Sequence, residues 1–184
     1  DNCIMPIPLG ILAVAGAGAA GGGNSFDLLE TTVLGSDAAT FTFSSLNSYT
    51  DYKHLQIRLV ARSTRATGND YITIRFNSDT GNNYSKHQVH GDGTNAGSSG
   101  AGSLNYITTM AQVPRAGNTA NEFGVSVIDV LDFSNTSKNT TVRFLSGYTS
   151  GIVYPIQLGS GAWYNTNTVT SMTFNCWKDR KSVV

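Results

Sequence analysis

Apolar and polar side chains alternate along much of the chain from residue 26 onward. Residues 54–62 read HLQIRLVAR and residues 71–77 read YITIRFN, and in both segments every second side chain is apolar. A period of two is typical of a strand with one face buried and one face in water. The same reasoning predicts further strands at residues 26–34, 40–43, 104–113, 140–145, 152–158 and 169–177.

One predicted strand differs from the others because it is apolar on both faces. Residues 123–133 read FGVSVIDVLDF, and Asp129 and Asp132 are the only charged side chains in this segment. Strands that are covered on both sides have such near-continuous apolar runs. We therefore expect a central strand with neighbours packed against both of its faces.

Turn-forming residues separate the predicted strands at residues 35–37, 67–70, 78–83 and 134–139. The longest polar stretch, residues 91–103 (GDGTNAGSSGAGS), is predicted to be an exposed and mobile loop. Strands recur at intervals of about ten to fifteen residues, and no window has the 3.6-residue period of a helix. These patterns predict an all-β domain at residues 26–177, a jelly-roll-like antiparallel β-sandwich.

The segment before this domain is apolar and rich in small residues. Residues 5–23 read MPIPLGILAVAGAGAAGGG, with no Lys or Arg ahead of the apolar part. Three interpretations remain open: a flexible arm at residues 1–25 that docks on a neighbouring subunit, a signal or lipid-facing segment, and a disordered tail. In the first, each buried side chain would contribute about 1–2 kcal/mol to docking, and the predicted interface residues are Ile7, Leu9, Ile11, Leu12 and Val14.

Both ends of the chain are predicted to be non-native. Residues 1–4 precede a natural start at Met5, which indicates read-through from an open sequence end. Residues 179–184 (DRKSVV) are what a common short-read sequencing adapter encodes in this frame, so residues 178–184 are expected to be a non-native tail. Reassembly from trimmed reads would test this, and six native codons at that place would contradict it.

Composition and charge narrow the classes of partner. Charged residues are 13% of the chain, and 12 basic residues balance 12 acidic ones, so the formal net charge is zero. Such a chain has no long-range field that favours nucleic acid or an anionic membrane, and we expect no stable membrane insertion. Weak colloidal repulsion suits a protein that packs into an assembly. The two cysteines, Cys3 and Cys176, could be bridged, but their spacing alone does not predict it.

The search for chemistry finds no catalytic constellation and predicts neither an enzyme nor a cofactor. Asp129 and Asp132 stand three apart on one strand and therefore point to opposite faces. His87 and His90 have the same spacing and lack a third ligand at a fixed distance, so surface histidines are favoured over a metal pair. The oxygen-rich residues 77–83 lack the closing acid of a calcium loop, and we expect a hydrogen-bonded Asx-type turn there.

Two surface features could serve binding. Arg58, Arg62 and Arg75 fall on outward faces of two predicted strands and could form a basic stripe, although a solvated face is the simpler interpretation. Trp163 and Tyr164 are aromatic residues late in the chain that could stack on sugars, although such residues are more often core or interface anchors. They are the candidate glycan-binding residues.

Two segments carry a resemblance to a known group of proteins: RFNSDTGNNYS at residues 75–85 and VIDVLDFSNTSKNTTVR at residues 127–143. Together with MPIPLGILAVAG, they resemble small virion-associated proteins of tailed bacteriophages, notably marine and cyanobacterial ones. The resemblance implies a virion component, as capsid decoration or as a head or tail fibre, that associates with itself and with other virion proteins. The alternative is a carbohydrate- or receptor-binding module that contacts a host surface glycan.

Overall fold

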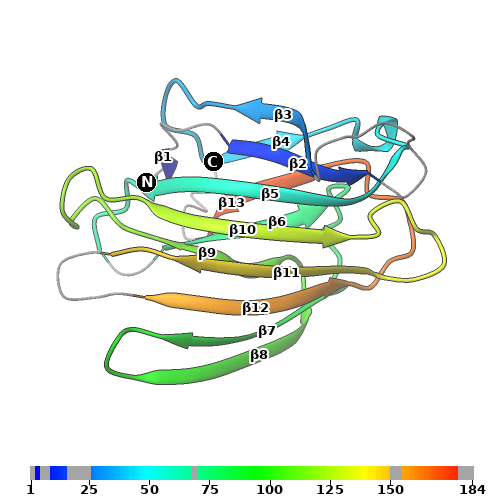
Figure 1. The fold of residues 1–184 in the computed structure, drawn as a ribbon. Coiled ribbons are helices and arrows are strands. Elements are labelled where there is room, and N and C mark those ends of the chain that lie inside the picture. The colour runs from blue at the N-terminus through cyan, green and yellow to red at the C-terminus, as the bar shows by residue number, and fades with distance from the viewer. Residues whose placement is uncertain (1–2, 5–8, 16–25, 68–69, 150–154, 178–184) are drawn as a thin grey trace, which may run out of the picture.

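The computed structural model describes residues 3–4, 9–15, 26–67, 70–149 and 155–177, with the backbone alone for the first two segments. Within these residues the chain forms two antiparallel sheets that pack face to face (Figure 1). The predicted all-β antiparallel sandwich is confirmed. The described part of the chain contains no helix with the length and hydropathy that crossing a membrane requires.

The larger sheet has nine strands among the described residues. In spatial order it holds β3 (Asp27–Thr32), β2 (Leu9–Ala15), β5 (Tyr52–Ser63), β10 (Gly124–Leu131), β11 (Thr140–Gly147), β12 (Ile156–Trp163), β7 (Tyr84–Gly91) and β8 (Ala96–Leu104). The short β1 (Cys3–Ile4) pairs with the end of β5. The meander β10–β11–β12 and the hairpin β7–β8 stay within this sheet.

In the described part of the chain the smaller sheet has four strands, in the order β4 (Thr40–Phe43), β13 (Met172–Cys176), β6 (Asp70–Phe76) and β9 (Ile107–Val113). The chain passes between the sheets after β3, β4, β5, β6, β8, β9 and β12. A single turn of 3-10 helix (Leu46–Ser48) follows β4. Cys176 on β13 is disulfide-bonded, a pairing that the sequence had left open.

The core lies between the sheets and is built from the inward half of each alternating strand. On β5, for example, Leu55, Ile57 and Leu59 are at most 1% exposed. The strands of the smaller sheet supply the opposing aromatic layer, in which Phe41 and Phe174 stack with ring centroids 4.7 Å apart. The alternation read from the sequence is therefore the alternation between core and water.

The strand predicted to be covered on both faces is covered on one. β10 is central, paired with β5 and β11, and its inner residues Ile128 and Val130 are fully buried. Its outer residues Val125 and Val127 are 54% and 39% exposed. The prediction of neighbours on both faces was wrong for the single chain, because among the described residues no layer covers the outer face of this sheet.

The N-terminal segment lies in the chain's own sheet over the part that is described. The backbone of β2 pairs with β5 from Gly10↔Arg58 to Ala15↔Tyr52 and with β3 on its other side. This placement differs from the expected free arm. Leu9, Ile11, Leu12 and Val14 belong to β2 by their backbone, and Ile7 lies outside the described residues. Their role as interface residues stays a prediction.

The predicted mobile loop at residues 91–103 is largely a strand. Residues 96–104 form β8, which pairs with β7 along its length and is exposed over nearly all of it. A tight turn connects β7 to β8: the Asp92 carboxylate accepts hydrogen bonds from the Thr94 and Asn95 amides, and Gly93 has φ 90°. The prediction was wrong because a Gly/Ser/Ala strand at a sheet edge lacks the apolar alternation by which strands are recognised.

Candidate functional site

Trp163, one of the two predicted glycan-binding residues, lies in the core. It is 1% exposed, and its ring packs beside Phe76 and Tyr84 with centroids 5.6 Å and 6.4 Å away. Its Nε1 donates to Asp79 Oδ2 at 2.8 Å. A glycan cannot reach this ring, so that expectation is corrected. Tyr164 is 55% exposed, and its hydroxyl donates to Ser85 Oγ at 2.9 Å.

The oxygen-rich residues 77–83 form the predicted Asx-type turn. Asp79 accepts from the Gly81 amide at 2.8 Å and from Asn83 Nδ2 at 2.9 Å. The hydrogen bonds from Asn83 and Trp163 hold the pKa of the Asp79 carboxyl below its ordinary value. The carboxylate is therefore used to tie the turn to the core tryptophan. No cluster of His, Cys, Asp and Glu suited to a metal ion occurs among the described residues.

The predicted basic stripe does not form, because its members lie on different sheets. Arg58 is on β5 of the larger sheet, whereas Arg75 is on β6 of the smaller one, where it donates to Asn105 O at 2.9 Å. Arg62 is 8% exposed, and its guanidinium donates to four backbone oxygens of the segment between β9 and β10. Arg62 therefore anchors a loop. The two histidines of the KHQVHG segment also separate, since His87 contacts Ser160 on the outer face and His90 faces inward.

The outer face of the larger sheet carries a continuous apolar band. Strand register places one row of side chains directly across six neighbouring strands: Arg58, Val127, Leu145, Leu158, Val89 and Ser98. The next row along the strands contains Val125 and Ile156 on either side of Gly147. We call Val125, Val127, Leu145, Ile156, Leu158 and Val89 the apolar band, and all six are between 39% and 56% exposed.

A polar row borders the apolar band. Asp129 lies between Gln56 and Arg143 in the register and is hydrogen-bonded to both, at 2.9 Å and 2.7 Å. Farther along the same row, Ser160 and His87 are 3.1 Å apart. Shallow hollows of about 430 Å³ and 730 Å³ lie along the band. An apolar centre with a hydrogen-bonded polar border is the anatomy of a protein–protein interface.

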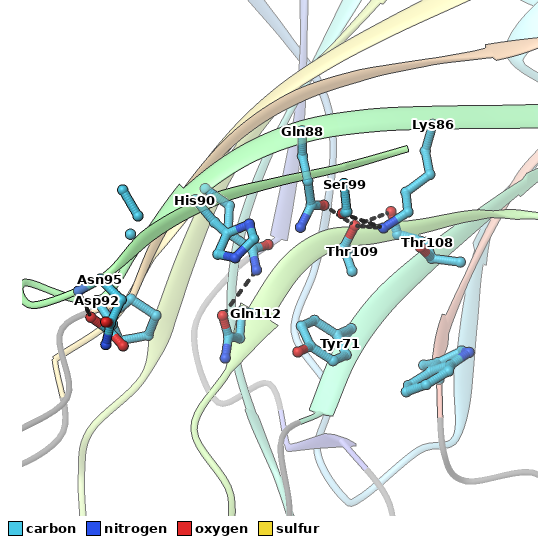
Figure 2. A pocket seen from close by; sticks show the side chains of 15 residues that line it. Tyr71, Lys86, Gln88, His90, Asp92, Asn95, Ser99, Thr108, Thr109 and Gln112 are labelled. Atoms are coloured by element: carbon cyan, nitrogen blue, oxygen red, sulfur yellow. Dashed lines mark hydrogen bonds between the residues drawn. The ribbon is translucent and has the colours of Figure 1, made fainter. Parts of the chain in front are cut away.

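A second feature, a polar cleft, lies on the inner side of the same sheet. The smaller sheet ends at β9, so the β7–β8 hairpin extends past its edge and leaves a space of about 500 Å³ between β7, β8 and β9 (Figure 2). Lys86, Gln88 and His90 occupy alternate positions of β7 and face this space. Gln112 and Thr109 of β9 form the opposite wall. We call this space the cleft.

Thr109 stands at an irregularity that turns β9 toward the cleft. The register between β6 and β9 shifts between Ile72 and Ile74, and Thr109 has φ 60°. A β-branched residue at positive φ is strained by about 1–3 kcal/mol. In this conformation the Thr109 hydroxyl donates to Gln88 Oε1, and Lys86 Nζ is 3.5 Å from Thr109 Oγ1. The bulge thus draws polar groups of both sheets together.

Two polar groups in the cleft lack a full partner among the described residues. Gln157 of β12 is 4% exposed and donates to Gln112 Oε1 at 2.9 Å, but its own Oε1 has no donor. Lys86 donates to hydroxyls at 3.4 Å and 3.5 Å, and no described carboxylate forms an ion pair with it. Burial lowers the pKa of the Lys86 ammonium group.

Sequence reasoning missed the cleft because its lining comes from five separate segments, at residues 71, 86–99, 108–112, 155–157 and 177. β7 was not predicted as a strand, since KHQVHG alternates polar groups with a single valine. Lys86, Gln88 and His90 share one face of this strand, but alternation alone would assign a polar face to solvent, so no local signal showed that it faces the core. A comparison of the chain with family models, with curated proteins and with solved structures found no match.

Proposed function

We propose that the chain is a non-enzymatic structural protein that works by packing its outer sheet face against another copy of itself. The observation that carries the proposal is the apolar band. Val127, Leu145 and Leu158 are direct register neighbours on three adjacent strands, and each is at least 39% exposed. Contiguous exposed apolar surface of this kind marks an interaction site more often than free surface.

The shape and composition of the face favour a second copy as the partner. The face is formed by the six neighbouring strands β5, β10, β11, β12, β7 and β8. With a spacing of about 4.8 Å between strands and a length of some eight residues each, these strands cover roughly 750 Å². A stable interface needs about 800 Å² from each partner. In a two-fold pair the same band meets itself, and the bordering Asp129–Arg143 pair gives each copy both signs of charge at the rim.

The setting that we propose for this packing is a phage virion, as capsid decoration or as a head or tail fibre. The support is the sequence resemblance of residues 75–85 and 127–143 to virion-associated proteins. The second segment covers residues 127–131 of β10, the turn after it and the start of β11, which supply Val127 of the band and the pair Asp129–Arg143 at its border. Mass spectrometry of purified particles that encode the chain tests this setting. Absence of the chain from intact particles would contradict it.

Sedimentation velocity of the full chain at micromolar to 100 µM concentrations tests the packing. We expect the wild type to associate and Leu145→Asp, which places a charge at the centre of the apolar band, to be a monomer. Leu28→Asp is the matched control, because Leu28 is 66% exposed on β3, outside the band. A monomeric wild type, or association that survives Leu145→Asp, would refute the proposal. Circular dichroism verifies that each variant is folded.

A further inference from the structure

The cleft is polar where a sandwich is ordinarily apolar. The side chains that face the space between two sheets normally form the core. At this end of the sandwich the inward residues of β7, β9 and β12 include Gln88, Gln112 and Gln157, and each of them is at most 8% exposed. Burying three amides and a lysine costs free energy unless their hydrogen bonds are met. A ligand that meets them gives this arrangement a physical reason.

The unmet groups define what the ligand must offer. Gln157 Oε1 is a buried acceptor and needs a donor such as a hydroxyl. The Lys86 ammonium is half-buried among hydroxyl groups and needs an anionic oxygen, because charge-assisted hydrogen bonds are the strong ones. A ligand that carries hydroxyl donors and a carboxylate satisfies both. Tyr71, which also lines the cleft, offers an aromatic ring at the wall (Figure 2).

The register sets the size of the ligand. Gln157 is the partner of His90, four residues along β7 from Lys86, and four residues of strand span about 13 Å. This separation is longer than one sugar ring. The cleft volume of about 500 Å³ is within the ordinary range of small-molecule sites. The ligand must therefore be more than a single small anion such as phosphate.

We propose that the cleft binds an acidic oligosaccharide of two or more rings, with its carboxylate at Lys86 Nζ and a ring hydroxyl donating to Gln157 Oε1. Thr109 and Ser99 hold the ammonium group in place from β9 and β8. The Gln112 side chain, whose Oε1 accepts a hydrogen bond from Gln157 Nε2 at 2.9 Å, lies on the opposite wall of the cleft. Its amide group would bind further hydroxyl groups of the sugar. The site is separate from the apolar band, which lies on the other face of the sheet, so the inference does not depend on self-association.

Isothermal titration calorimetry of the full chain tests the inference with four probes. Two are acidic, a uronic-acid disaccharide and sialyllactose, and two are neutral, cellobiose and lactose. We expect at least one acidic probe to bind ten-fold more tightly than either neutral one. Lys86→Met should remove this preference, and Gln157→Leu should weaken binding about ten-fold. Lys53→Met is the matched control, since Lys53 is exposed on β5, away from the cleft, and should bind like the wild type.

Hydrogen exchange on the wild type keeps the test decisive if a cleft variant fails to fold. Binding of an acidic probe should slow amide exchange in β7 and β9 and leave β3 unchanged. Three results would overturn the inference: no binding of any probe at 1 mM, equal binding of acidic and neutral probes, or binding that both cleft substitutions leave intact. Protection confined to strands outside the cleft would overturn it as well.

Discussion

Gly159→Ala is the substitution whose effect the structure defines most sharply. Gly159 stands on β12 between Phe144 of β11 and Gln88 of β7 in the register. A Cβ at this position would lie 2.7 Å from the carbonyl oxygen of His87 and 2.7 Å from Cε1 of Phe144. The glycine lets the Phe144 ring, which is 2% exposed, lie directly over the strand backbone.

The expected loss follows from which neighbours could move. His87 O belongs to the backbone of the strand paired with β12, so it cannot retreat without breaking the pairing of β7 and β12. The Phe144 ring would have to leave its place in a close-packed core. Overpacking of this kind costs about 1–3 kcal/mol. For a domain of this size, that loss corresponds to a fall in Tm of roughly 2–12 °C.

Urea denaturation followed by circular dichroism measures this loss, with Gly102→Ala as the matched control. Gly102 is also a strand glycine, on β8, but nothing lies within 4 Å of a Cβ built there. An unhindered Gly→Ala change stabilises a protein by about 0.4–1 kcal/mol through the unfolded state. The control should therefore be neutral or stabilising. A Gly159→Ala variant within 0.5 kcal/mol of the wild type would refute the packing described for β12.

Three further predictions concern hydrogen bonds. Trp163→Phe removes the indole donor to Asp79 and should lower the free energy of unfolding in urea by about 1.5–3 kcal/mol; an unchanged midpoint would count against this bond. The pKa of Asp79 is lowered by the hydrogen bonds from Asn83 and Trp163, and that of Asp132 by the hydrogen bond from Lys138. Both carboxylates thus stabilise the fold above their ordinary pKa of 3.8, and this stabilisation should be lost as the pH falls below that value. The Tm should therefore drop in this pH range, and it should drop less in the Asp79→Asn variant than in the wild type. Arg62→Lys cannot serve four carbonyl oxygens with the same geometry, so it should cost about 1–3 kcal/mol and speed proteolysis between β9 and β10; resistance equal to the wild type would contradict the anchoring role.

Local alternation was enough to predict much of the fold. The predicted strands at residues 40–43, 54–62 and 71–77 coincide with β4, β5 and β6 to within two residues at each end. The reason is physical, because a strand with one buried face must alternate apolar and polar side chains. The same signal fails for β8, which buries neither face and is held by backbone pairing with β7.

The aromatic residues and the cations were assigned less well from the sequence. Trp163 was a reasonable candidate for stacking on a sugar, yet it is a core residue whose polar edge is satisfied by Asp79. Arg62 was placed on a solvated face, yet it binds four carbonyl oxygens. Whether a large amphipathic side chain is buried depends on which distant segment lies over it, and a local pattern carries no information about that segment.

What the chain determines by itself is the set of strands with two unlike faces and a double-sided apolar segment at residues 123–133. Which apolar face stays uncovered was decided by tertiary structure, because the order of strands sets the extent of the second layer. The smaller sheet stops at β9, so the polar face of β7 overhangs the cleft, and no described element covers Val125 and Val127 on the outside. Side chains far apart in the sequence, such as Lys86, Thr109 and Gln157, meet only through this arrangement of sheets.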